Sequence, residues 1–127
     1  MKISIGININ DSSFPWTDVI LSGKKRIETR NTPTLDPYLG KRVGIIRTGV
    51  GKAILVGFVD IVGKKVYSSV EEFRKDEYLH LVKIDSPFDF KGSKIGYVLQ
   101  NPEKLSTPTA VETRGIVSRK INVEQEQ

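Results

Sequence analysis

The sequence contains no cysteine and has one histidine, one tryptophan and one methionine among its 127 residues. The absence of cysteine excludes disulfides, thiolate zinc sites and cysteine nucleophiles, and it is compatible with a reducing cytoplasm. The one histidine, His80, excludes metal sites and catalytic triads that use several histidines. A triad with one histidine stays open, although nothing else in the sequence points to it. Because apolar residues surround it in YLHLV, we expect His80 to be a partly buried structural side chain.

Long apolar runs are absent as well. No stretch approaches the ~18 consecutive apolar residues of a membrane-spanning helix. The start, MKISIGININ, lacks the unbroken apolar stretch and the small-residue cleavage site of a signal peptide. There is no Gly-rich phosphate loop with its lysine, and no dinucleotide fingerprint. We therefore expect a soluble cytoplasmic protein with no membrane contact, no metal and no cofactor.

Positive charge is in excess. The chain has 20 lysines and arginines against 15 aspartates and glutamates, which gives a formal net charge of +5 and a pI of about 9.5. Such a balance permits binding to a polyanion through electrostatic attraction to phosphates. It does not establish binding, because many basic domains are simply soluble.

The length suits one domain that buries a core without disulfides or metals. We find no repeat, low-complexity segment or linker that would divide the chain. We therefore expect a single domain over residues 1–121, followed by a polar tail over residues 122–127.

The spacing of apolar residues predicts several short strands. Isoleucine alternates with small or polar residues over 3–9, which is the period of a half-buried strand. Gly49 and Gly51 fit a turn between two further strands rich in β-branched residues. The other predicted strands span residues 27–30, 42–48, 53–62 with 66 as an alternative end, 94–99 and 115–121.

Two short helices are predicted among these strands. The first begins near Pro15, with Ser12 or Ser13 as its N-cap and Trp16 on its apolar face. Gly23 stands where a left-handed helix cap is wanted.

The second helix follows Ser69, which forms a capping-box pattern with Glu72. We expect its Val70 and Phe73 to face the core and the helix to reach about Tyr78. Because strands dominate and do not alternate regularly with helices, the sequence predicts a mainly β (α+β) fold, a small antiparallel β-barrel with two short helices.

The segment SGKKRIETR, residues 22–30, holds five charged residues in nine positions. Its only acid is Glu28, which lies between Arg26 and Arg30. In one interpretation the segment is an exposed edge on which Glu28 pairs with an arginine, and such pairs contribute about 0–1 kcal/mol. In the other interpretation the charges line a ligand site.

The longer string PWTDVILSGKKRIETR closely resembles the signature of the ASCH domain, a family of the PUA-like superfamily. That signature has a proline–aromatic pair, an apolar helix, a Gly-x-Lys motif and a Glu-x-Arg motif. The matching residues are Pro15-Trp16, Gly23-Lys24-Lys25 and Glu28-Thr29-Arg30. Residues 97–102, YVLQNP, resemble the family's late strand, which often ends in Asn-Pro, and Leu105 and Gly115-Ile116 also fit. The resemblance spans residues 1–121.

The resemblance implies a PUA-like barrel with helices closing its ends. It also implies a cleft beside the barrel, lined by the residues of the two motifs, that accepts RNA, a nucleotide or a modified nucleoside. A barrel of this size can work as a monomer, which is our expectation. The site residues implied or suggested for ligand binding are Trp16, Lys25, Glu28 and Arg30.

The side-chain chemistry of these residues can be argued separately. Arg30 offers a planar fork for a phosphate or a carbonyl edge. Glu28 can hold Arg30 or Lys25 in place, or accept from the amino group of a base. Lys25 can contact a phosphate, or act as a base if burial and the charges of Arg26 and Arg30 lower its pKa. Trp16 is either a stacking platform or, as we favour for most of the ring, a core residue.

Strand geometry sets a condition on this site. In one regular strand, Glu28 and Arg30 would share a face, while Lys25 and Thr29 would point the other way. Lys25 can join Glu28 only if it still lies in the turn before the strand. A helix cap at Gly23 favours that arrangement.

A hydrolase is the alternative function. Some ASCH-like proteins resemble amidohydrolases of acylated cytidine that use a lysine, a threonine and a glutamate. The lysine matches Lys25, but the threonine position is Glu28 here, and the glutamate would be Glu71 or Glu72. Other relatives are thought to cleave RNA, for which Lys25 could be the base and Arg30 the anion stabiliser. In this alternative Lys25 and Glu28 are the candidate catalytic residues.

We favour ligand binding over hydrolysis because the nucleophile position has changed. A third interpretation is a structural or interaction domain whose charged segment is only surface. The sequence also leaves open whether the long polar loop over 31–40, next to Arg30, acts as a lid.

Overall fold

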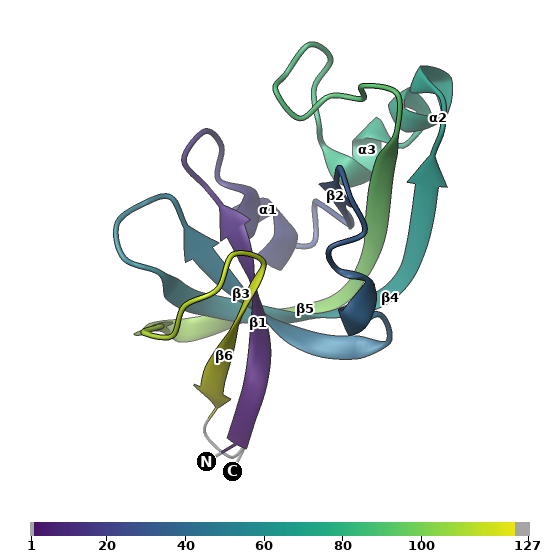
Figure 1. Cartoon of the computed structure of the whole chain (residues 1–127). Helices are drawn as coiled ribbons and strands as arrows, with labels where there is room; N and C mark the ends of the chain where they lie inside the picture. The colour runs from purple at the N-terminus through teal and green to yellow at the C-terminus, as the bar shows by residue number, and fades with distance from the viewer. Residues whose placement is uncertain (1, 124–127) are drawn as a thin grey trace.

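The computed structural model describes residues 2–123, with side chains from Ser4 onward. Within these residues six strands form one sheet in the order β2-β5-β4-β3-β1-β6 (Figure 1). The strands are β1 (Lys2–Asn10), β2 (Ile27–Arg30), β3 (Lys41–Thr48), β4 (Ile54–Tyr67), β5 (Lys94–Ala110) and β6 (Ser118–Val123). The helices are α1 (Trp16–Leu21), α2 (Val70–Lys75), α3 (Glu77–His80) and a short 3₁₀ turn, η1 (Asp36–Tyr38). No helix in this part of the chain is both long enough and apolar enough to cross a bilayer.

The sheet is mixed and open. The predicted small antiparallel β-barrel is therefore wrong in two respects, since the sheet does not close and one strand pair is parallel. β1 runs parallel to β3, with Gly6 opposite Gly44, because the chain makes a long excursion through α1 and β2 before it returns. The other neighbouring strands pair antiparallel. The two edge strands, β2 and β6, do not pair with each other. β2 has four residues and pairs only with the start of β5, which leaves no edge long enough to close the sheet.

β4 and β5 are longer than predicted. β4 continues to Tyr67, and β5 continues past Pro102 and Pro108 to Ala110. Proline is tolerated there because β2 pairs only with Ile95–Val98, so the later part of β5 has one unpaired edge. Three register shifts between β4 and β5 mark bulges or irregularities. Bulges bend a strand pair, and in Figure 1 both ribbons curve towards α2 and α3.

The first helix begins as predicted but is capped differently. Neither Ser12 nor Ser13 caps it, since the Asp11 carboxylate accepts from the backbone N–H of Thr17 at 3.1 Å and from its hydroxyl at 2.5 Å. Gly23 has φ +83°, so the predicted left-handed cap is confirmed. This cap turns the chain from α1 into β2 within a few residues.

The second helical region is two helices, because the chain breaks at Asp76. Ser69 Oγ accepts from the backbone N–H of Glu72 at 3.2 Å, as the capping box predicts. Phe73 is fully buried, but Val70 is 44% exposed, so its predicted core position is wrong. Val70 lies in the first turn, just beyond the end of β4, and faces solvent.

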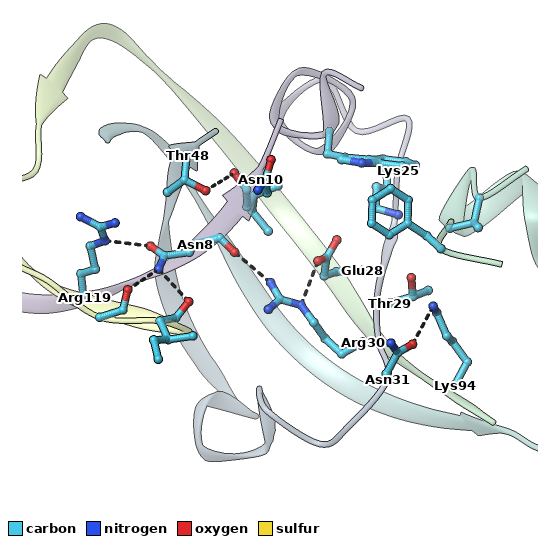
Figure 2. A pocket seen from close by; sticks show the side chains of 16 residues that line it. Asn8, Asn10, Lys25, Glu28, Thr29, Arg30, Asn31, Thr48, Lys94 and Arg119 are labelled. Carbon is cyan, nitrogen blue, oxygen red and sulfur yellow. Dashed lines mark hydrogen bonds and ion pairs between the residues drawn. The ribbon is translucent and has the colours of Figure 1, made fainter. Parts of the chain in front are cut away.

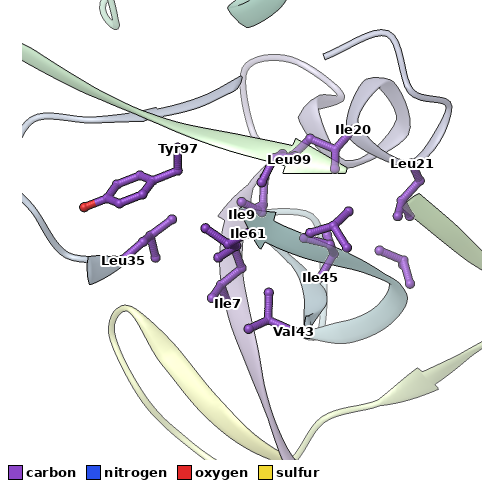
Figure 3. Packing of buried hydrophobic residues seen from close by; sticks show 12 residues of the cluster. Ile7, Ile9, Ile20, Leu21, Leu35, Val43, Ile45, Ile61, Tyr97 and Leu99 are labelled. Carbon is purple, nitrogen blue, oxygen red and sulfur yellow. The ribbon is translucent and has the colours of Figure 1, made fainter. Parts of the chain in front are cut away.

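The core lies on the face of the sheet that α1 covers (Figure 3). Ile7 and Ile9 of β1 are 0% and 3% exposed, which confirms the alternation in the first strand. A separate small cluster joins Tyr67, Phe73 and Val82. The last strand begins at Ser118 rather than at residue 115 and includes residues 122 and 123, which had been predicted as tail. The rest of the predicted tail, residues 124–127, lies outside the described residues.

Candidate functional site

A cleft of about 490 Å³ opens along β2, within the range of roughly 300–1,000 Å³ usual for small-molecule sites (Figure 2). Its walls come from β1, α1, β2, β3, β5, β6 and the loops before β5 and β6. The lining residues are Asn8, Ile9, Asn10, Trp16, Lys25, Glu28, Thr29, Arg30, Asn31, Thr48, Val82, Phe88, Lys94, Gly115, Ile116 and Arg119. Trp16, Lys25, Glu28 and Arg30, the four site residues predicted from the sequence, are among them.

The charged segment divides into exposed and buried residues. Lys24 and Arg26 are exposed, as a solvated edge would require. Lys25 and Glu28 are only 2% and 9% exposed. An exposed edge therefore explains two of the five charged residues and leaves the buried charges to be explained.

Lys25 meets the geometric condition set by the sequence. β2 begins at Ile27, so Lys25 is still in the turn, where its backbone N–H donates to Val19 O at 2.8 Å. The ammonium donates to the backbone carbonyl of His80 and lies 4.5 Å from the centroid of the Trp16 ring. Lys25 and Glu28 consequently line the same cleft. Thr29, which regular alternation would turn away from Glu28, lines it too.

The pKa of the Lys25 ammonium is lower than that of an ordinary lysine. Burial lowers its pKa from 10.5 to about 8, with the charges of Arg30 and Lys94 adding to this effect and Glu28 opposing it. Arg26, which we had expected to contribute, is exposed and is not among the causes. A minority of Lys25 is therefore neutral at neutral pH.

Glu28 and Arg30 form an ion pair at the centre of the cleft, as Figure 2 shows. Arg30 Nε lies 3.0 Å from Glu28 Oε2, and Arg30 Nη2 donates to the backbone carbonyl of Asn8 at 3.0 Å. These two bonds fix the guanidinium and leave three of its five N–H donors without a partner among the described residues. The arrangement holds a planar donor group ready for a ligand.

Trp16 contacts both the core, as predicted, and the cleft. The half-buried ring packs against the central core cluster and also lines the cleft. It lies 4.4 Å from the Phe14 ring and 5.9 Å, edge-on, from the Phe88 ring. The cleft thus has an aromatic wall next to its cationic one.

His80 is fully buried rather than partly buried. Its ring stacks on Phe73 at 4.0 Å, Nδ1 accepts from the Val82 N–H at 2.9 Å, and Nε2 lies 2.8 Å from Phe73 O. This pattern requires a neutral ring with the proton on Nε2. Burial lowers the pKa of His80, in agreement with that form. The locked residue in turn presents its backbone carbonyl to Lys25.

Several lining residues were missed by sequence analysis. Lys94 is 4% exposed and donates from Nζ to Asn31 Oδ1 at 2.8 Å. Arg119 Nε donates to Asn8 Oδ1 at 3.2 Å. Lys94 and Arg119 are far from the charged segment in the sequence. Only the pairing of the strands in the sheet brings them to the same cleft.

The glutamates considered for hydrolysis, Glu71 and Glu72, are exposed on α2 and do not line the cleft. Glu72 instead accepts hydrogen bonds from the N–H and hydroxyl of Ser68. Among residues 2–123 we find no cluster of three or more histidines, aspartates and glutamates suited to a metal ion.

Comparison with known proteins identifies the fold class. The sequence matches no protein-family model and no curated protein. The structure does match crystal structures of ASCH from Zymomonas mobilis. For one of them the TM-score is 0.68 at 19% identity, over 84% of this chain and 73% of that one. Two point mutants of that protein match with TM-scores of 0.68 and 0.65, at 19% and 20% identity. The match to the first mutant covers 84% of this chain and 75% of the mutant chain. The match to the second covers 83% of this chain and 73% of the mutant chain.

This protein therefore has an ASCH-like fold, which confirms the resemblance found in the sequence. It is a mainly β fold with an open, six-stranded mixed sheet and three short α-helices in the described residues. At this level of identity the likeness concerns the fold.

Proposed function

We propose that the cleft binds RNA or a nucleotide-like ligand, and that it does so by contacting the anionic groups and the base edges of that ligand. The observation that carries this proposal is the charge of the lining. Four cations, Lys25, Arg30, Lys94 and Arg119, converge on one cleft that contains a single carboxylate, Glu28. Such a lining attracts phosphate groups. The attraction between the cations and a phosphate is stronger where water is partly excluded.

Each part of the cleft fits one part of such a ligand. The remaining donors of Arg30 suit a phosphate or a carbonyl edge. The second carboxylate oxygen of Glu28 has no partner among residues 4–123 and can accept from an amino group, as carboxylates do with bases. The aromatic wall of Trp16 and Phe88 offers a surface for a planar ring.

The one tryptophan of the sequence is itself the probe for the test. Nucleoside monophosphates, nucleosides and short RNAs are titrated at low salt while Trp16 fluorescence is followed. We expect Arg30→Ala to weaken binding about 10- to 100-fold, since hydrogen bonds to a charged group contribute about 1.5–3 kcal/mol. Arg26→Ala removes an arginine from the same segment outside the cleft, and we expect a change of less than about twofold.

Equal losses in the two variants would indicate a general charge effect and contradict a site at this cleft. Circular dichroism of both variants checks that each is folded. For short RNA, the slope of log K against log salt measures the number of phosphates contacted. A slope near zero would contradict a phosphate-based mode.

A hydrolase is the second candidate, and the Lys25 pKa of about 8 favours it. The neutral amine can take a proton from water or from a ribose hydroxyl, and Arg30 can stabilise the anion that develops. Glu28 occupies the position of the threonine in the amidohydrolase constellation, so this position supplies no hydroxyl nucleophile for a covalent route. This candidate predicts turnover that rises with pH through an apparent pKa near 8 and is lost in Lys25→Met. Binding without turnover at pH 9 would exclude it.

A further inference from the structure

Two buried lysines face the cleft without an ionic partner. Lys25 and Lys94 are 2% and 4% exposed. Among the residues that the structure describes, neither ammonium lies in an ion pair. Each donates one hydrogen bond to a neutral oxygen, of His80 and of Asn31 respectively. A buried charge is costly unless it is paired, so this arrangement lacks a counter-charge.

The acids near these lysines are already engaged. Glu28 pairs with Arg30 at 3.0 Å, and Asp89, whose charge reaches Lys94, pairs with Arg74 at 2.8 Å. The two ammonium groups therefore leave two positive charges unbalanced in this part of the cleft. Burial lowers the pKa of both lysines, which is the expected sign for cations that lack a counter-ion.

The lysines also have hydrogen-bonding capacity to spare. An ammonium has three N–H donors, and each of these two uses one in a conventional hydrogen bond. Thr29, which lines the cleft between them, adds a hydroxyl, and Figure 2 shows these three residues on one side of the Glu28–Arg30 pair. Several donors on one side of a cleft suit an anion with several acceptor oxygens.

We propose that Lys25, Thr29 and Lys94 form a subsite for a dianionic phosphate monoester. A monoester carries about −1.5 to −2 charges at pH 7 and balances both ammonium groups. An internal phosphodiester carries one charge and leaves one lysine uncompensated. Resting on the proposed function, this subsite selects ligands with a terminal phosphate, such as a nucleoside monophosphate or a phosphorylated RNA end.

The test compares three forms of the same nucleoside. Nucleoside 5′-monophosphates, the matching 3′,5′-cyclic diesters and the nucleosides are titrated by calorimetry at constant ionic strength. We expect monoesters to bind at least about tenfold more tightly than diesters. The preference should increase between pH 5.5 and 7.5, because the second phosphate pKa is about 6. Inorganic phosphate should compete with the monoester.

Variants of single lysines test which residues cause the preference for monoesters. Lys94→Met replaces the buried ammonium with an apolar chain of similar length, and we expect it to reduce the monoester preference to near onefold. Lys52→Met is the control, since Lys52 is exposed, does not line the cleft and is not among the charges that act on Lys25 or Lys94. The preference of this variant should be unchanged. NMR of the lysine Nζ groups in the unmutated protein is an independent measurement, in which phosphate must raise the pKa of Lys25 and Lys94.

The outcomes separate this subsite from the proposed function. Equal affinity for monoesters and diesters, or a preference that survives Lys94→Met, would overturn the subsite and leave nucleotide binding intact. Binding of inorganic phosphate with the lysine pKa changes, but of no nucleotide, would support the subsite and contradict the function. No binding and no change in the lysine resonances would overturn both.

Discussion

Lys25 shows how a buried charge without an ionic partner among the described residues costs stability. Its folded-state pKa of about 8 is below the 10.5 of the unfolded chain, so between these values the unfolded state binds more protons. The stability of the protein therefore rises with pH across this window, and at pH 7 the full cost is present. A pKa change from 10.5 to about 8 corresponds to ~3 kcal/mol.

This cost predicts a particular pH dependence for Lys25→Met. The variant lacks the titrating amine, so its stability relative to the unmutated protein should fall by ~2 kcal/mol between pH 7 and pH 9.5. Urea denaturation at the two pH values measures the difference. Lys24→Met, an exposed neighbour, should show no such change. A constant difference for Lys25→Met would contradict the lowered pKa of Lys25.

At the scale of elements, the packing of α1 on β4 depends on Gly57. A Cβ at this position would meet the backbone oxygen of Glu103 and approach the Leu21 side chain of α1 to 2.6 Å. Gly57→Ala should therefore reduce the free energy of unfolding by about 1–3 kcal/mol. In the same strand, a Cβ at Gly63 would have its nearest neighbour, in Val98, at 3.6 Å. Gly63→Ala should be nearly neutral, and equal effects of the two variants in urea denaturation would contradict this account.

Elements defined by local patterns were predicted well. The strand over 27–30 has the predicted bounds, and the Gly23 cap and the Ser69 cap are both present. The sequence predicted an end to this strand at residue 99, close to the Asn101-Pro102 pair with which the late strand of the resembling family often ends. The strand continues there because one of its edges is unpaired, which depends on tertiary pairing.

The same limit applies to the site. Trp16, Lys25, Glu28 and Arg30 lie within 15 consecutive positions, so a local signature was enough to group them. Asn8, Lys94 and Arg119 come from other strands. The sequence gives no sign that Lys94, a single lysine at the start of a strand, is buried. Alternation of apolar residues predicts the strand, but it does not specify which other strand lies beside it.

At the scale of the whole molecule, the buried residues form unequal clusters. The central cluster has twelve buried residues, while that of Tyr67, Phe73 and Val82 has three and supports α2 and α3. Fewer buried apolar contacts give a smaller free energy of local opening. Hydrogen exchange should show α2 and α3 opening before β1 and β3. A bound ligand should slow exchange near Val82 and Lys94, which line the cleft. Uniform exchange across all elements would contradict this division.

The position of β6 has a consequence for the order of biosynthesis. β6 pairs with β1, the first of the described strands in chain order. It carries Arg119, while the loop before it carries Gly115 and Ile116. A nascent chain that has emerged only as far as Ala110 already holds Lys25, Glu28 and Arg30, but it lacks one wall of the cleft. The cleft is therefore complete only after β6 has joined the sheet.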